Sequence, residues 1–272
     1  MAHSSTSLHE VRRASLDWAD VDVSGQQRAP ARLDDSALPV ARLPVLSGAE
    51  ITAAAERFAD VDQTTALLEW TIATFGSRWL LASSWQHAVL VDQLARLVDR
   101  VPVVEFDTEL LFAETHATRE RILDRYAVDV ISMRPARSVA EQGVALGPNL
   151  WERDPDRCCH DRKVVPLRQL LADRDAWVTG VRRGQSSTRR DVQVVEADLA
   201  NGVVKVNPLA RWTDADIDAY IALHDVPCNP MLAEGYPSIG CMPCTQPAPD
   251  GDARGGRWTG HAKTECGLHA PR

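Results

Sequence analysis

The stretch that decides the fold runs from Trp79 to Thr108 and reads WLLASSWQHAVLVDQLARLVDRVPVVEFDT. It contains two short apolar runs, 79–82 and 101–106, and each is followed by small polar residues. Between them, the segment 87–98 carries apolar residues at helical spacing: Val89, Leu90, Leu94 and Leu97. Strand, helix and strand in this order form the repeating unit of a parallel sheet.

The same alternation extends in both directions. Upstream, Ser47-Gly48-Ala49-Glu50 has capping-box spacing before an Ala-rich helix, and a second helix is predicted over 64–74, stopping near Gly76. Downstream, we predict helices over about 109–126, 162–171 and 213–224, and strands over 128–133, 176–180 and 203–206. The chain is therefore predicted to form a doubly wound, mostly parallel α/β sheet.

Plausible ligand groups follow three of the predicted strands. In doubly wound sheets, ligands bind beyond the carboxyl ends of the strands. The candidate substrate-binding residues at these ends are Ser83, Ser84, Trp85, Gln86, Asp107, Thr108 and Gly180. Their convergence predicts one binding site, independently of any family.

Bulk composition narrows the class of protein. The 272 residues suffice for one large α/β domain or two small ones, and the formal net charge of −8 argues against wholesale nucleic-acid binding. No apolar run approaches the roughly 20 residues that span a bilayer, and the first 30 residues lack a signal-peptide layout, so we expect a cytoplasmic protein. We expect a poorly ordered extension over 1–45, an α/β domain over 46–250 and a mobile tail over 251–272.

Positive charge is concentrated in two short segments. Arg182, Arg183, Arg189 and Arg190 form one cluster, and Arg254, Arg257, His261 and Lys263 form the other. As patterns alone, such clusters favour a solvated face. A local concentration of cations can nevertheless bind a small anion.

The six cysteines indicate metal or thiol chemistry in a cytosolic chain. Cys241 and Cys244 form a C-x-x-C pair, a spacing shared by zinc sites, iron–sulfur clusters and redox disulfides. Zinc sites rarely take adjacent ligands such as Cys158 and Cys159, whose side chains diverge by about 100° on a helix. Buried small hydrophobes are the alternative for the tandem pair alone. Together the four favour a [4Fe-4S] site over zinc.

Two cysteines remain. Cys228, in Val226-Pro227-Cys228-Asn229-Pro230, has no other cysteine at a useful spacing and is interpreted as a buried free thiol. Cys266 lies in the tail near Lys263 and His269, surroundings that can lower a thiol pKa. Its own context leaves a reactive thiol and an inert surface thiol equally open.

Six motifs carry a family resemblance: 106–108 (FDT), 158–163 (CCHDRK), 178–183 (VTGVRR), 204–209 (VKVNPL), 235–241 (GYPSIGC) and 263–269 (KTECGLH). Taken together, they resemble the assimilatory adenylyl-sulfate (APS) reductases of the phosphoadenylyl/adenylyl-sulfate (PAPS/APS) reductase family. The likeness covers roughly residues 76–270. It implies a sheet of the adenine-nucleotide alpha-hydrolase-like (PP-loop) type.

The resemblance also implies a reaction in sulfate assimilation and cysteine biosynthesis. The Cys266 thiolate attacks the sulfonyl sulfur of APS, AMP leaves, and a thioredoxin-type dithiol releases sulfite from the S-sulfocysteine. Anion-binding positions fall on Lys163, Arg189, Arg254 and Arg257, and Arg182 and His269 join the candidate substrate-binding residues. The [4Fe-4S] cluster on Cys158, Cys159, Cys241 and Cys244 is expected to act structurally and electrostatically. With the family in view, both arginine clusters are interpreted as functional, although Arg182 and Arg183 could equally fold their loop.

Three rivals remain open. A PAPS reductase is the nearest, but enzymes with that preference generally lack both cysteine pairs. An ATP-pyrophosphatase-type enzyme, such as a tRNA thiolase, shares the layout, but the loop 83–87 has no glycine with which to cradle a polyphosphate. The third rival is a zinc-stabilised binding module without catalysis. The oligomeric state is left open.

Overall fold

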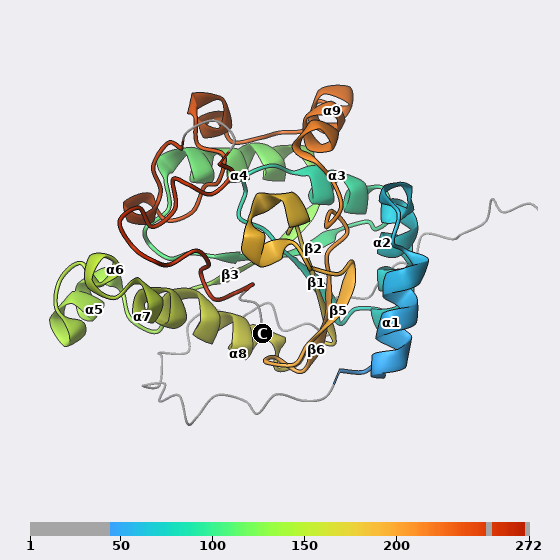
Figure 1. Ribbon diagram of the computed structural model, residues 1–272, viewed down its shortest axis with the longest axis horizontal. Helices are drawn as coiled ribbons and strands as arrows, with labels where there is room; N and C mark the ends of the chain where they lie inside the picture. Colours follow the sequence, from blue (N-terminus) through green and yellow to red (C-terminus); the bar gives the residue numbers. More distant parts are fainter. Residues whose placement is uncertain (1–43, 249–251, 270–272) are drawn as a thin grey trace, which may run out of the picture.

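A six-stranded sheet forms the centre of the molecule, in the order β3-β2-β1-β4-β6-β5 (Figure 1). The computed structural model describes residues 44–248 and 252–269. The strands are β1 (Trp79–Ala82), β2 (Val101–Phe106), β3 (Val128–Met133), β4 (Ala176–Thr179), β5 (Val195–Asp198) and β6 (Val203–Val206). All neighbours pair in parallel except β5 and β6, which pair antiparallel. The predicted mostly parallel α/β sheet is confirmed.

Nine α-helices surround the sheet in the described part of the chain: α1 (Gly48–Arg57), α2 (Thr64–Phe75), α3 (Val89–Ala95), α4 (Ala113–Arg125), α5 (Val139–Leu146), α6 (Leu150–Arg153), α7 (Pro155–Cys159), α8 (Val165–Leu171) and α9 (Asp214–His224) (Figure 1). Capping boxes start α1 at Ser47, α5 at Ser138 and α9 at Thr213. The caps at Ser47 and Thr213 are those predicted from the sequence.

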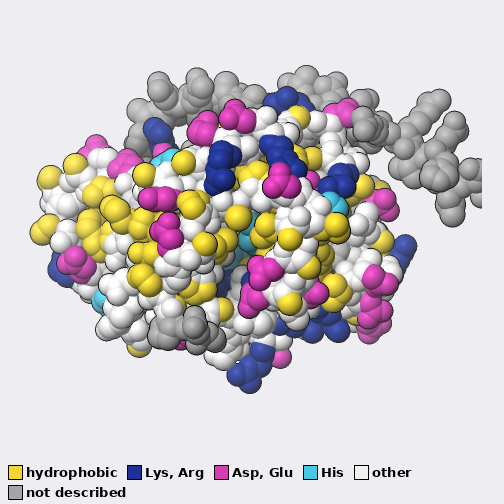
Figure 2. All heavy atoms as spheres, turned by 90° about the horizontal axis from the view of Figure 1, so that it is seen from above, with side chains coloured by type: hydrophobic (Ala, Val, Ile, Leu, Met, Phe, Trp, Pro, Cys, Tyr) yellow, Lys and Arg dark blue, Asp and Glu magenta, His cyan; other side chains and the backbone are white. Residues whose placement is uncertain are grey.

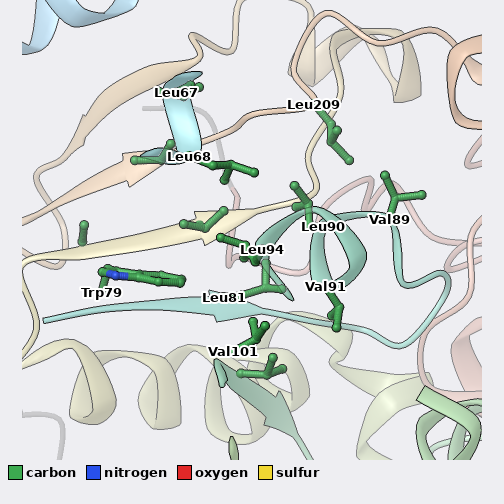
Figure 3. Packing of buried hydrophobic residues seen from close by; sticks show 14 of the residues in the cluster. Leu67, Leu68, Trp79, Leu81, Val89, Leu90, Val91, Leu94, Val101 and Leu209 are labelled. Atoms are coloured by element: carbon green, nitrogen blue, oxygen red, sulfur yellow. The ribbon is translucent and has the colours of Figure 1, made fainter. Parts of the chain in front are cut away.

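Apolar side chains cover both faces of the sheet. Along β1, Trp79 and Leu81 pack into the larger core with residues of α2 and α3 (Figure 3). Leu80 packs on the opposite face with residues of α8. Successive side chains of a strand point to opposite faces, and a parallel sheet needs both faces covered. This explains why β1, β2 and β4 read as continuous apolar runs.

Two predicted helix starts differ clearly from the structure, and some short elements were not predicted. The helix predicted from about residue 109 begins at Ala113, because Asp107 Oδ1 accepts a hydrogen bond from the Glu109 N–H and Leu111 pairs with Cys241. The helix predicted from residue 162 continues from α7 through a π-helical turn, His160–Val164. The edge strand β5 and the helices α5 and α6 were not predicted.

Charged side chains of both signs are interspersed on the face seen from above, without one extended basic patch (Figure 2). Among the helices described, none has the length and apolar character to cross a membrane. The predicted extension over 1–45 lies almost entirely outside the described residues. The cytoplasmic location and the domain boundary near residue 250 stay predictions.

Candidate active site

A cavity of about 210 Å³ opens beyond the carboxyl ends of β1, β2 and β4. Its walls include the loop 83–87 after β1, Glu105 and Phe106 at the end of β2, and Thr179 to Val181 after β4. Ser83, Ser84, Trp85, Gln86 and Gly180, all predicted at strand ends, line it. A pocket at this edge is the usual ligand site of a doubly wound sheet.

Side-chain contacts hold the loop after β1 in one shape. Trp85 has a positive φ of 56°, and its buried indole Nε1 donates to Glu105 Oε2 at 2.5 Å. The Gln86 amide donates to the Pro237 carbonyl at 3.1 Å and accepts from the Ile239 N–H at 3.2 Å. The loop is therefore tied to the segment that leads into Cys241.

Two predicted strand-end residues lie away from this cavity. Asp107 forms an ion pair with Arg134 at 2.9 Å, and Thr108 is fully buried with its Oγ1 3.3 Å from Cys241 Sγ. Neither appears among the residues that line the cavity. The end of β2 contributes Glu105 and Phe106 to the cavity wall instead, and Leu111 from the following segment also lines it.

The four paired cysteines line a second, smaller cavity. Cys158 and Cys159 come from the end of α7, Cys241 precedes the short 3₁₀ turn Met242–Cys244, and Cys244 is its last residue. None of the four forms a disulfide. Within 44–248 and 252–269, no three His, Cys, Asp or Glu side chains converge closely enough for one metal ion. The thiols line the walls of a space, and four thiols around a space form a donor set suited to an iron–sulfur cluster.

The electrostatic surroundings of the four thiols differ. Burial raises the pKa of Cys158, Cys159 and Cys244 to about 11 each. For Cys241, burial again acts upward, but Lys163, the Thr108 hydrogen bond and Arg257 outweigh it and lower the pKa. Lys163 lines both cavities. Burial acts to lower its pKa, but the nearby Cys241, Cys266 and Cys159 thiols raise it overall, so it stays a cation.

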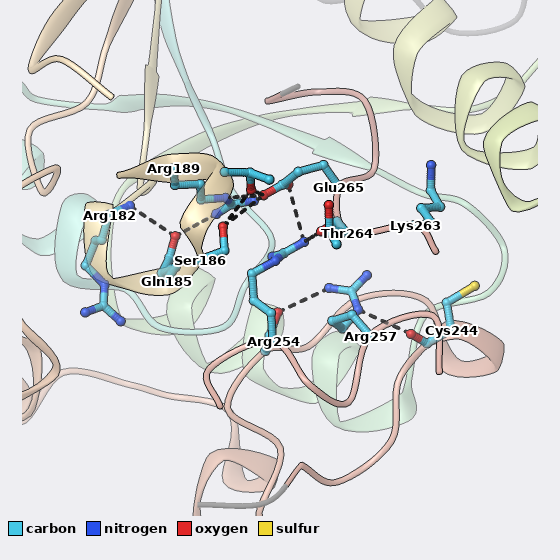
Figure 4. A network of polar contacts seen from close by, with 12 residues as sticks. Arg182, Gln185, Ser186, Arg189, Cys244, Arg254, Arg257, Lys263, Thr264 and Glu265 are labelled. Atoms are coloured by element: carbon cyan, nitrogen blue, oxygen red, sulfur yellow. Dashed lines mark hydrogen bonds and ion pairs between the residues drawn. The ribbon is translucent and has the colours of Figure 1, made fainter. Parts of the chain in front are cut away.

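Four cations face the larger cavity: Lys163, Arg189, Arg254 and Arg257. Burial and the charge of Arg189 lower the pKa of Arg254 to about 10. The Arg254 Nε is buried and finds no acceptor in the part of the chain described. Arg257 donates to the Cys244 carbonyl and to Ser238 Oγ, at 3.3 Å each (Figure 4). Its guanidinium lies where a Cβ at Gly240 would be, so a side chain at position 240 would displace the Arg257 guanidinium.

The tail returns to this cavity. Cys266 is half-buried and lines it, together with Leu268 and His269. Gly267 has a φ of +89°, Leu268 packs with the α8 face of the sheet, and the His269 ring stacks on Trp177 with centroids 5.4 Å apart. The structure thus holds the tail docked, and its mobility stays a prediction.

Arg182 and Arg183 lie outside the cavity lining. Arg182 forms an ion pair with Asp214 at 2.5 Å, and Arg183 donates to the Val192 carbonyl at 2.7 Å. Both contacts fold the loop that carries Arg189. Several other lining residues were not predicted from the sequence, among them His87, Gln185, Ser238, Ile239 and Gly240. The motif 235–241 was the available signal for the last three.

Residues 79–247 match the model of the phosphoadenosine phosphosulfate reductase domain. The chain belongs to this family. Members similar to it include the adenosine 5'-phosphosulfate reductase of Rhodococcus opacus, 48% identical over 75% of this chain and 87% of the relative. The adenosine 5'-phosphosulfate reductase of Mycolicibacterium smegmatis is 49% identical over 75% of this chain and 86% of the relative. The predicted membership of the PAPS/APS reductase family is confirmed.

Solved structures share the fold. A phosphoadenylyl-sulfate reductase from Candida auris, in a phosphate complex, matches 75% of this chain and 100% of its own, with a TM-score of 0.64 and 25% identity. The FMN adenylyltransferase of Candida glabrata matches with a TM-score of 0.50 and 16% identity over 75% of this chain and 70% of its own, which supports the fold alone. This chain therefore has the PP-loop type of sheet that the sequence predicted.

Proposed function

We propose that this protein reduces APS to sulfite and AMP in sulfate assimilation, with Cys266 as the nucleophile and a thioredoxin-type dithiol as reductant. One observation carries the proposal: Cys266 lines the same cavity as Lys163, Arg189, Arg254 and Arg257. A thiol beside four cations is suited to attack an anionic group. The names of the relatives, which are APS reductases, support APS as the substrate.

The reaction divides into two displacements. The Cys266 thiolate attacks the sulfur of the sulfate group, the bond from that sulfur to the bridging oxygen breaks, and AMP leaves with the oxygen. A thiolate of the dithiol then attacks the Cys266 sulfur and expels sulfite. The second thiol of the reductant resolves the mixed disulfide, which restores Cys266 and leaves the reductant oxidised by two electrons.

Charge is the main obstacle to the first step, because a thiolate must approach a phosphosulfate. Lys163, Arg254 and Arg257 offset this negative charge from fixed positions on the cavity wall. The unpaired Arg254 Nε is a donor available to a substrate oxygen. The His269 Nδ1 is likewise buried without a hydrogen-bond partner among the residues the structure describes.

Cys158, Cys159, Cys241 and Cys244 are proposed to hold a [4Fe-4S] cluster. Their shared cavity and lack of disulfides support this assignment. The cluster would add charge next to Lys163, which lines both cavities. Both electrons of the reduction come from the dithiol, and this chain's residues bind the substrate and supply the nucleophile.

Substrate preference is the first test of this function. We expect the purified protein to turn over APS at least tenfold more efficiently than PAPS, measured as kcat/KM for sulfite release with a thioredoxin system. Equal or reversed preference would contradict APS as the substrate. ATP hydrolysis without APS turnover would instead favour the ATP-pyrophosphatase class.

Replacing Arg257 tests whether the cations that line the cavity bind the substrate. A hydrogen bond to a charged group contributes about 1.5–3 kcal/mol, so Arg257→Ala should lower kcat/KM for APS by roughly 10- to 150-fold. Arg190→Ala is the matched control, since Arg190 is exposed and its side chain donates to the Ser187 carbonyl and to no other residue in the described part of the chain. Equal kinetics for the two variants would remove Arg257 from the substrate site.

A further inference from the structure

Glu265, the residue before the proposed nucleophile Cys266, has a carboxylate that accepts several hydrogen bonds. Glu265 is buried, with 8% of its surface exposed. Arg189 donates to it through Nε and Nη2, at 2.7 Å each, and Arg254 Nη2 lies 3.3 Å from Oε2 (Figure 4). Thr188 and Ser186 add hydroxyl contacts at 3.0 and 3.4 Å.

The ion pair between Arg189 and Glu265 differs from an ion pair on the protein surface. Exposed pairs contribute little, but the pairing of Arg189 with Glu265 is two-pronged, and the two side chains are only 7% and 6% exposed. Burial acts to raise the pKa of Glu265, yet the hydrogen bond and charge of Arg189 lower it overall, so the carboxylate is ionised. Breaking such a pair leaves a buried charge without its partner.

The contacts of Glu265 join it to the loop after β4 and to an earlier part of the tail. Arg189 belongs to the loop after β4, 76 residues away in sequence, and Arg254 lies in the tail, 11 residues before Glu265. Arg254 also donates to the Thr264 carbonyl at 3.0 Å. The segment just before Cys266 is thereby held in place by both Arg189 and Arg254. The turn at Gly267 and the packing of Leu268 hold the other side.

Glu265 faces the two arginines from outside the cavity lining, while Cys266 and the same arginines line it. Its carboxylate therefore orients Arg189 and Arg254 without standing between them and a ligand. We propose that Glu265 is the positioning residue that sets both the place of the Cys266 sulfur and the orientation of the two arginines. This inference rests on the proposed role of Cys266 as nucleophile.

The test replaces one oxygen of the carboxylate. Glu265→Gln keeps the size of the side chain and removes its charge, and Glu265→Asp keeps the charge but shortens the reach. Thr264→Ala is the matched control, because Thr264 is the exposed neighbour and contributes only its carbonyl to the contacts with Arg254. The holoprotein is mixed with saturating APS, and S-sulfocysteine on the Cys266 peptide is measured over time by mass spectrometry.

Misplacing a reacting group by about 1 Å can cost 10²-fold in rate. We expect Glu265→Gln to form the intermediate about 10- to 100-fold more slowly, with KM for APS changed less than about threefold, and Glu265→Asp to recover part of the rate. Hydrogen–deuterium exchange should become faster in the peptide containing 259–269 of Glu265→Gln and stay unchanged in β1, β2 and β4. Thr264→Ala should behave as the wild type.

Two results would overturn the positioning role. One is a Glu265→Gln protein with the wild-type rate or wild-type exchange in the tail. The other is a lower KM for APS in this variant, which would show that Glu265 competes with the substrate for the arginines. Failure of the proposed function itself is distinguishable, because the wild-type protein would then form no S-sulfocysteine on Cys266.

Discussion

Cys266→Ser should lower the rate of sulfite release from APS by at least about 10³-fold. A serine hydroxyl is not ionised at neutral pH, whereas a cysteine thiol is partly ionised and strongly nucleophilic, so the substitution removes the attacking group while nearly keeping its size. The cations of the cavity remain and still bind the substrate. The rate is measured as sulfite formed with a thioredoxin system, and APS binding is measured separately.

Cys228→Ser is the control for this substitution. Cys228 is half-buried, lines neither of the two cavities described, and forms a backbone bridge with His87 in the loop after β1. This variant should release sulfite at the wild-type rate. A Cys266→Ser protein that still released sulfite at a tenth of the wild-type rate would contradict a covalent mechanism on Cys266.

Cys241→Ser should remove the bound iron together with the visible absorption of the purified protein. Cys241 is buried, its Sγ lies 3.3 Å from Thr108 Oγ1, and the next residue donates its N–H to the Leu110 carbonyl at 2.7 Å. Loss of a ligand therefore also loosens the contact between the Cys241 segment and 107–112. Because binding of a metal centre adds to folding free energy, we expect a lower melting temperature as well.

Iron and acid-labile sulfide are the deciding measurements for this variant. The same Cys228→Ser protein should keep about four iron atoms and four sulfides per chain, as expected for a [4Fe-4S] cluster. Unchanged iron in Cys241→Ser would remove Cys241 from the ligand set. If the wild-type protein contained one zinc ion per chain and no sulfide, the four cysteines would form a zinc site and not a cluster.

The parallel strands were predictable because burial on both faces makes them continuous apolar runs. β5 was missed because it is a short edge strand whose residues Val195-Glu196-Ala197-Asp198 alternate with charges. α5 was also missed, although Ser138 and Glu141 have capping-box spacing that could have revealed it. Short segments at the edge of a fold carry weak periodic signals.

The candidate site was predictable where topology alone decides. The loop after β1 and Gly180 lie at the cavity because parallel strands end at one edge of the sheet. Asp107 and Thr108 follow the same rule in sequence, but contacts with Arg134 and Cys241 hold them elsewhere. Such contacts join residues far apart in the chain, and spacing does not reveal them.

The docking of the tail was not predicted for the same reason. Composition suggested a mobile segment, whereas Glu265 reaches Arg189 and His269 reaches Trp177. No local pattern in the tail points to either partner. The family resemblance identified Arg189 and Cys266 as candidate functional residues. The structure adds the Arg189–Glu265 ion pair, which brings their two segments together.

The most direct test of the account is to trace the sulfur of APS. APS labelled with radioactive sulfur is incubated with the wild-type protein without reductant, and the digested protein is mapped. We expect label on the peptide that contains Cys266, and release of that label as sulfite when thioredoxin is added. Label on another cysteine, or sulfite formed with no labelled protein, would contradict it.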